Sequence, residues 1–228
     1  MVRLKNSHVG GGARRGAMMR YAGMPMAMWA LFERSFTQGL SNVLNYDTQT
    51  ASAIAKKAKP RYRQIIGDLP TFEREDRFKA NIISCAMLCA FVLCMPRRPT
   101  VDELTSYYES CMTTPAMRWF CRKAGKNKFS DNDMRSQRDT AALRAGDRNP
   151  YSWNMEFRPY ADGSGYEACF TTCGICALMR ELGLFDLVPA MCHLDYTMSE
   201  LGGASVFVRE HTLASGGPYC DCGYRKLL

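Results

Sequence analysis

The chain has 228 residues, of which 46% are hydrophobic and 23% are charged, and its formal net charge is +8. This composition is that of an ordinary globular protein and excludes wholesale disorder. No apolar run reaches the roughly 20 residues of a membrane-spanning helix, and the basic N-terminus lacks the apolar segment of a secretory signal. We therefore expect a cytoplasmic protein without a membrane partner.

The positive charge is concentrated in the N-terminal segment and in the run Lys56–Arg63. Basic clusters are the usual electrostatic footprint of nucleic-acid-binding proteins. No recognised nucleic-acid-binding module accompanies either segment, so we do not expect a nucleic-acid partner. Residues 1–22 lack hydrophobic periodicity and contain three consecutive glycines, which predicts a flexible basic arm. The run Lys56–Arg63 is expected to be a solvated helix face.

Residues 23–150 have the periodicity of helices. Apolar residues between Met24 and Val43 recur at spacings of three and four, which predicts an amphipathic helix. A second helix is expected over 50–66, either kinked at Pro60 or divided there into two. The most apolar segment, Glu73–Met95, is expected to be the central helix of the core. Two of its three cysteines, Cys85 and Cys89, lie four positions apart and should pack in that core.

Capping signals mark the helices that follow. Thr100 and Glu103 form a predicted capping box, in which each side chain accepts a backbone N–H at the start of a helix. The pair Thr114–Pro115 should begin another helix, because proline fits the first helical turn. The polar segment Gly125–Pro150 is expected to connect two halves of the molecule, with one short helix over Met134–Leu143.

After Pro150 the hydrophobic period changes from about 3.6 to 2, which indicates strands. In chain order we expect strand, strand, helix, helix, strand and strand over residues 152–159, 166–171, 173–182, 189–201, 205–213 and 219–227. Residues 151–228 should thus form an antiparallel sheet of about four strands packed with helices. The predicted fold class is α+β, with the helical region 23–150 and the C-terminal region integrated into one domain.

Thiols are concentrated after Gly165. Six of the eleven cysteines lie there, namely Cys169, Cys173, Cys176, Cys192, Cys220 and Cys222. The odd count favours reduced thiols. One interpretation is a zinc site with the ligands Cys173, Cys176, Cys220 and Cys222. Another is a catalytic thiolate, because Cys173 lies where a helix begins and Arg209 would supply a nearby cation. A third is that all six only pack.

Three motifs after residue 171 carry a family resemblance. They are TCGICALMRELG at 172–183, AMCHLDY at 190–196, and REHTLASGG at 209–217 followed by Cys220-Asp221 and Tyr224-Arg225. In these motifs the chain resembles the L-2-amino-thiazoline-4-carboxylic acid hydrolase family. Cys222 departs from the family pattern, which more often has an aromatic residue after the Cys-Asp pair.

The resemblance implies a hydrolase that opens a small cyclic amidine, such as 2-aminothiazoline-4-carboxylate, to an N-carbamoyl amino acid. We predict no cofactor, and the zinc site described above stays open as the alternative. Arg209 is expected to bind the substrate carboxylate. The other expected substrate-binding residues are Thr212, Gly216 and Gly217. The expected acid–base residues and nucleophiles are Asp195, Asp221, His193, Cys173, Cys192 and Cys220. Whether water or a thiolate attacks the substrate stays open, as does assembly into a homo-oligomer.

One pocket should contain Cys173, Cys192, Asp195, Arg209, Cys220 and Asp221, whereas Cys176 and Cys222 are expected to be packing residues. Neighbouring residues on a strand point to opposite faces, so Cys220 and Asp221 share a pocket only if a bulge intervenes. The alternative function is a small-molecule- or metal-binding sensor module on the same fold. A set of four converging thiolates would favour that alternative.

Overall fold

A computed structural model of the chain describes residues 21, 23–73, 75–146 and 149–227. The predicted basic arm, residues 1–22, lies outside the described residues except for Tyr21. The Tyr21 side chain is buried, donates a hydrogen bond of 2.7 Å to the Pro70 carbonyl and packs against Phe72. In the described part of the chain, every helix is too short or too polar to cross a lipid bilayer.

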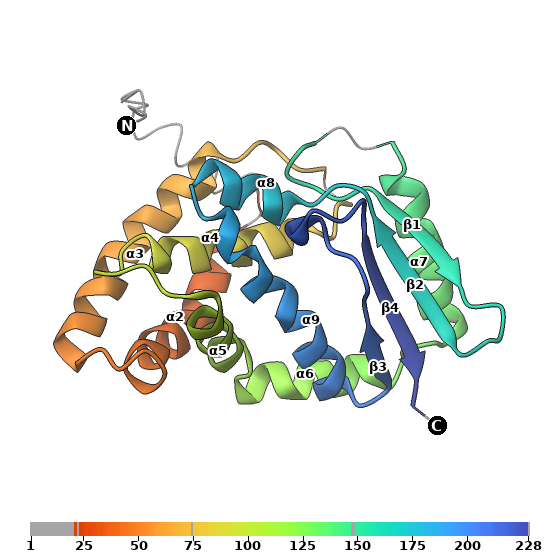
Figure 1. The fold of residues 1–228 in the computed structure, drawn as a ribbon, viewed down its shortest axis with the longest axis horizontal. Helices are drawn as coiled ribbons and strands as arrows, with labels where there is room; N and C mark the ends of the chain where they lie inside the picture. Colours follow the sequence, from red (N-terminus) through yellow and green to blue (C-terminus); the bar gives the residue numbers. More distant parts are fainter. Residues whose placement is uncertain (1–20, 22, 74, 147–148, 228) are drawn as a thin grey trace.

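The N-terminal half is a group of helices, seen at one end of the molecule in Figure 1. Its helices are α2 (Met24–Asn42), α3 (Thr48–Asp68), α4 (Lys79–Val92) and α5 (Val101–Met112). Every residue of α4 from Ile82 to Val92 is buried, and α4 contacts α2, α3 and α8. This confirms α4 as the central helix of the core, including the predicted packing of Cys85 and Cys89.

Two predicted helices differ from the structure in extent or form. Helix α3 continues through Pro60 as one element. Helix α4 begins at Lys79 and not at Glu73, because Asp76 holds the preceding segment as a loop. The Asp76 carboxylate accepts the backbone N–H of Phe78 at 2.8 Å and forms an ion pair of 2.7 Å with Arg144.

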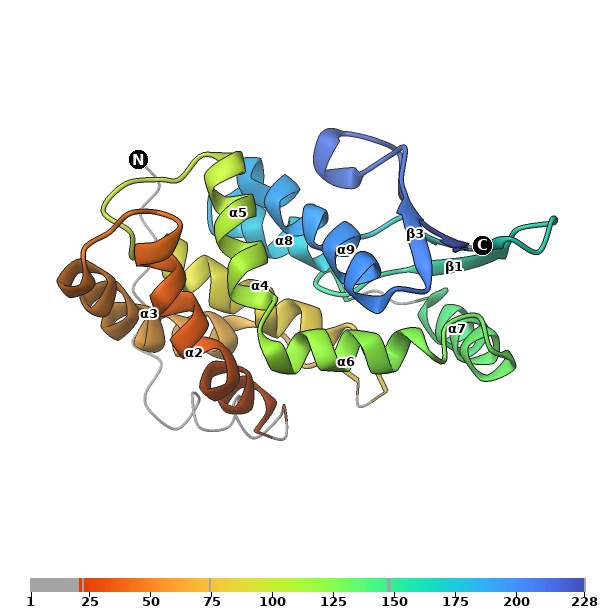
Figure 2. The ribbon, with the colours of Figure 1, turned by 90° about the horizontal axis from the view of Figure 1, so that it is seen from below.

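Capping side chains define the helices that lead to the sheet, α6 (Pro115–Gly125) and α7 (Asp131–Arg144). The predicted capping box of Thr100 and Glu103 is present at the start of α5, and Thr114 caps α6. Helix α7 is longer than predicted, because the Ser130 hydroxyl accepts the Asp133 N–H and starts the helix earlier. In Figure 2, α6 extends from the helical half towards α7, which lies beside the sheet.

The C-terminal half is an antiparallel sheet of four strands in the order β1-β2-β4-β3. The strands are β1 (Met155–Pro159), β2 (Gly165–Phe170), β3 (Ser205–Val208) and β4 (Cys220–Lys226). Between β2 and β3 lie the helices α8 (Gly174–Glu181), η1 (Phe185–Leu187) and α9 (Val188–Gly202). Strand β3 ends earlier than predicted, because residues 209–219 form a loop that contains η2 (Leu213–Ser215). The α+β fold class is thus confirmed.

Helices cover one face of this sheet. Tyr166 of β2 donates to Asp133 of α7, and Phe207 of β3 packs edge-on against Tyr196 of α9. The opposite face carries charged residues, as expected for an antiparallel sheet with one solvated side. A single cluster of buried hydrophobic residues extends from Trp29 of α2 to Cys222 of β4, so the two halves share one core.

Candidate active site

A cavity of about 210 Å³ lies over the helix-covered face of β2 and β4. Its floor is formed by three cross-strand pairs, Tyr166–Tyr224, Ala168–Cys222 and Phe170–Cys220. Strand residues two apart share a face, so the alternation of each strand brings these side chains to the same side. The walls come from α9, the start of α8 and the residue after β3, through Cys192, Asp195, Cys173 and Arg209.

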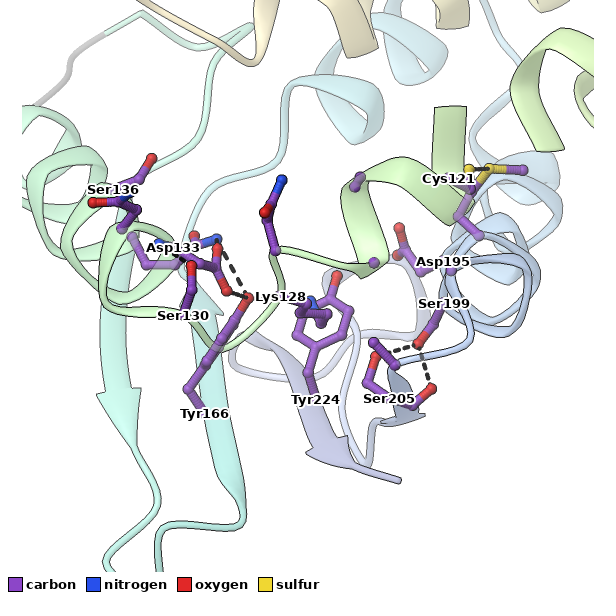
Figure 3. A pocket seen from close by; sticks show the side chains of 18 residues that line it. Cys121, Lys128, Ser130, Asp133, Ser136, Tyr166, Asp195, Ser199, Ser205 and Tyr224 are labelled. Carbon is purple, nitrogen blue, oxygen red and sulfur yellow. Dashed lines mark hydrogen bonds between the residues drawn. The ribbon is translucent and has the colours of Figure 1, made fainter. Parts of the chain in front are cut away.

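A larger and more open cavity of about 630 Å³ adjoins the first. The two have lining residues in common, namely Lys128, Gln137, Tyr166, Asp195 and Tyr224. Figure 3 shows this larger cavity, with Asp133 and Tyr166 on one side and Asp195 and Ser199 on the other. The two cavities form a cleft whose inner part holds the thiols and whose outer part is lined mainly by polar side chains.

Asp195 and Arg209 form an ion pair at the junction of the two cavities. Arg209 also donates to the Cys192 carbonyl at 3.1 Å and to the Cys222 sulfur at 3.2 Å, and its side chain is only 5% exposed. Asp195 by contrast keeps 46% of its side chain exposed. Loss of bulk water raises the pKa of Asp195 above its usual value, and the Arg209 guanidinium opposes that rise. One side of the Asp195 carboxylate is therefore bound by Arg209, and the other side is accessible from the larger cavity.

Cys173 is the residue immediately before α8. The Cys176 thiol and the backbone N–H groups of Ile175 and Cys176 stabilise its thiolate and lower the pKa of Cys173, against the effect of burial. Gly174 allows this arrangement, because a Cβ there would come within 2.1 Å of the Tyr151 carbonyl oxygen. A thiolate at a helix N-terminus is a common form of reactive cysteine.

The other three thiols of the cavity have the opposite tendency. Burial raises the pKa of Cys192 to about 12 and that of Cys222 to about 12. Burial also raises the pKa of Cys220, whose sulfur accepts the Leu213 N–H at 3.2 Å. Among the four cysteines that line the cavity, Cys173 is thus the one whose thiolate is favoured.

Five of the six residues expected around one pocket line the inner cavity, namely Cys173, Cys192, Asp195, Arg209 and Cys220. The sixth, Asp221, does not line it. No bulge interrupts β4, so Asp221 points to the opposite face, where it accepts the backbone N–H groups of Glu210 and His211 at 2.8 and 2.6 Å. Asp221 therefore holds the loop after β3 in place.

The remaining candidates also differ from expectation. His193 is exposed and stacks on Tyr196, and it does not line the cavity. Thr212 caps η2, and Gly216 and Gly217 belong to the same loop, outside the lining. Cys222 is buried as expected, but it also lines the cavity and accepts a hydrogen bond from Arg209.

Among the polar residues of the inner cavity that sequence reasoning missed are Arg77, Lys128, Gln137 and Tyr166. They come from the loop before α4, the loop between α6 and α7, α7 itself and β2. No motif joins them, and only the antiparallel pairing and the position of α7 bring them together. Tyr166 alone gave a signal, since its place at the start of a predicted strand put it on one face with Ala168 and Phe170.

The zinc alternative finds no support in this geometry. In the described ranges, no group of three or more His, Cys, Asp or Glu side chains is arranged to hold a metal ion. Cys220 and Cys222 line the cavity with Cys173. The Cys222 sulfur, however, accepts a hydrogen bond from Arg209, and Cys176 does not line the cavity. The four thiols proposed as ligands therefore do not form one tetrahedral set.

The fold and the cavity define an α+β protein with one favoured thiolate and one open carboxylate in a shared cleft. The chain belongs to the L-2-amino-thiazoline-4-carboxylic acid hydrolase family, whose sequence profile matches residues 78–224. The match extends from the start of α4 to β4 and confirms the resemblance seen in the three motifs. Comparisons with curated proteins and with solved structures gave no significant match.

Proposed function

We propose that this protein is a hydrolase that opens a small cyclic amidine of the 2-aminothiazoline-4-carboxylate type, with Cys173 as the nucleophile. Membership of the family supports the reaction class. The observation that carries the assignment is that Cys173, with its lowered pKa, and Asp195 line the same cavity. Such a hydrolysis requires at least a nucleophile and an acid–base group that line the same cavity.

Asp195 is suited to bind the amidine. A protonated cyclic amidine is a planar cation with two N–H groups on one edge, and a carboxylate accepts such a pair of hydrogen bonds. The Arg209 guanidinium orients the carboxylate from behind, while the exposed part of Asp195 faces the cleft. This contact would place the electron-poor amidine carbon in the cavity that Cys173 lines.

The reaction would proceed in two steps. The Cys173 thiolate attacks the carbon of the protonated amidine, the bond from that carbon to the ring sulfur breaks, and the departing sulfur takes up the proton that the amidinium nitrogens give up. The substrate is then attached to Cys173 as an open-chain isothiourea. Water adds to the same carbon, Asp195 accepts a proton from it, and the bond to the Cys173 sulfur breaks. The products are a free thiolate on the enzyme and an N-carbamoyl amino acid, with one water consumed.

Mass spectrometry of the purified protein with 2-aminothiazoline-4-carboxylate tests this assignment, because the product is heavier by one water. Cys173→Ala and Asp195→Asn should each reduce turnover by about a hundredfold or more, since each removes a group that acts in the transition state. Cys169→Ala is the matched control, because Cys169 is a buried thiol of β2 outside the cavity lining. Full turnover in Cys173→Ala would exclude the covalent route.

A further inference from the structure

Two cations, Lys128 and Arg77, line the inner cavity together with Cys173 and Asp195. Lys128 lies in the loop between α6 and α7, where its ammonium group is 3.1 Å from the Tyr166 hydroxyl and 3.4 Å from the centre of the Tyr224 ring. Burial lowers the pKa of Lys128 to about 8, with a smaller lowering contribution from the charge of Arg77 and an opposing contribution from the Asp133 carboxylate. The two cations are thus close enough to repel each other.

Arg77 lies in the loop before α4. Its guanidinium donates to the Gln137 side-chain oxygen at 2.8 Å and lies 5.4 Å from the centre of the Phe78 ring. Gln137 belongs to α7, so Arg77 is linked to the same helix that supports Lys128 through Tyr166. These contacts place both cations on the same part of the cavity lining.

Neither cation has a carboxylate within ion-pair distance among the described residues. The nearest acid in the network is Asp133, and its oxygens are already engaged. Asp133 accepts the Tyr166 hydroxyl at 3.1 Å, the Phe129 N–H at 2.8 Å and the Gln137 amide at 3.1 Å. Neutral groups thus separate Asp133 from both cations, and the positive charge at the cavity wall is left without a direct counterion. Lys128 is half-buried and Arg77 is exposed, so an anion that enters the cavity would meet two cations that no carboxylate of the described residues neutralises directly.

Arg209 was the residue expected to bind the substrate carboxylate, and its contacts argue against that role. Its guanidinium is bonded to Asp195, the Cys192 carbonyl and the Cys222 sulfur, and its side chain is almost fully buried. A second carboxylate would have to compete with Asp195 for the same donors. An anionic group entering the cavity therefore has Lys128 and Arg77 as its available cations.

We infer that Lys128 and Arg77 form a carboxylate-binding subsite, which holds the acid group of the substrate while Asp195 holds its amidinium. This assignment rests on the proposed function for the identity of the ligand, but the subsite itself is a property of the cavity. The cavity then has a cationic wall and an anionic carboxylate, which match the two ends of a small zwitterion. Cys173 lines the same space, so the subsite also determines which electrophiles approach its sulfur.

Alkylation of Cys173 tests the subsite without reference to any substrate. Iodoacetate and iodoacetamide react with the same thiolate but differ in charge, so the ratio of their rates reports the cations around the sulfur. The ratio is measured at Cys173 by mass spectrometry of the full-length protein. Lys128→Gln and Arg77→Gln should each lower the ratio of iodoacetate to iodoacetamide by about tenfold, the usual effect of losing one charge-assisted hydrogen bond. Lys128→Arg keeps the positive charge and should retain the wild-type ratio.

Lys126→Gln is the matched control, because Lys126 lies in the same loop, is exposed and lines neither cavity. An equal loss in Lys126→Gln would mean that the general positive field steers the reagent, and would overturn the subsite. An unchanged ratio in both Lys128→Gln and Arg77→Gln would overturn it as well. If wild-type protein prefers iodoacetate but does not hydrolyse the aminothiazoline acid, the proposed function fails and the subsite stands.

Binding measured by calorimetry is the second test. In a Cys173→Ser background, 2-aminothiazoline-4-carboxylate and 2-aminothiazoline share the amidine ring and differ in the acid group. Lys128→Gln should weaken binding of 2-aminothiazoline-4-carboxylate by about tenfold and leave binding of 2-aminothiazoline, which lacks the acid group, unchanged. Equal weakening of both ligands would show that Lys128 supports the cavity and does not contact the carboxylate.

Discussion

The buried ion pair between Asp76 and Arg144 offers a strong test of how the two halves of the fold are joined. Their side chains are 1% and 4% exposed, and the charged atoms are 2.7 Å apart. Asp76 also accepts the Ser152 hydroxyl at 2.5 Å and the Phe78 N–H at 2.8 Å. One carboxylate therefore links the loop before α4, the end of α7 and the segment that leads into β1.

Asp76→Asn keeps the shape of the side chain but removes the negative charge that lies 2.7 Å from the buried Arg144 guanidinium. Removing one partner of a buried pair costs about 3–5 kcal/mol. For a domain of this size, that loss lowers the midpoint of thermal unfolding by roughly 6–20 °C. Circular dichroism during heating measures the midpoint, and urea unfolding gives the free energy independently.

The matched control is Glu73→Gln. Glu73 contacts the same guanidinium at 3.5 Å, but its side chain is 72% exposed. Exposed pairs contribute about 0–1 kcal/mol, so this variant should unfold close to the wild-type temperature. The double variant Asp76→Asn/Arg144→Met should recover part of the loss, because it replaces the buried cation with an apolar side chain when its closest anion is removed. If Asp76→Asn is no less stable than Glu73→Gln, the ion pair does not hold the halves together.

Two further predictions follow from the titration of groups in the cavity. Cys176→Ala removes the hydrogen bond that contributes most to the lowered pKa of Cys173. The pH at which the reactivity of Cys173 towards iodoacetamide rises should therefore increase in Cys176→Ala and stay unchanged in the control Cys169→Ala. An unchanged pH profile in Cys176→Ala would refute this role of Cys176. For hydrolysis, kcat/KM should fall at low pH as the Cys173 thiolate is protonated, and fall again above about pH 8 as Lys128 loses its proton. Lys128→Arg should remove the upper decline, and its persistence would assign that decline to another group.

Most elements of the fold were predictable, because periodicity and capping are local properties. The alternation of Trp153, Met155 and Phe157 gave β1, and the Thr100 capping box gave the start of α5. The boundaries that failed depend on distant residues. Helix α4 starts late because Asp76 pairs with Arg144, which is remote in sequence, and no local pattern records that pair.

Residues of the candidate site were predictable only where they belong to short sequence motifs. Cys173 and Asp195 were predicted because Cys173 immediately precedes a helix and Asp195 lies on one, and each belongs to a short motif of the family. Lys128 and Arg77 come from separate loops and meet only after α7 packs beside the sheet. Asp221 was misplaced because the family motif groups it with Cys220, although strand geometry sends the two side chains to opposite faces.

The all-round burial of α4 has a consequence for how the family segment is delimited. The family match begins at residue 78, where α4 starts, so α2 and α3 lie outside it. Yet α2 and α3 cover one side of α4, and α8, which positions Cys173, packs on another. A fragment cut at the family boundary would expose the apolar surface of α4 that α2 and α3 cover, next to the helix that Cys173 precedes. The segment that the family profile matches is therefore shorter than the part of the chain that packs into one core.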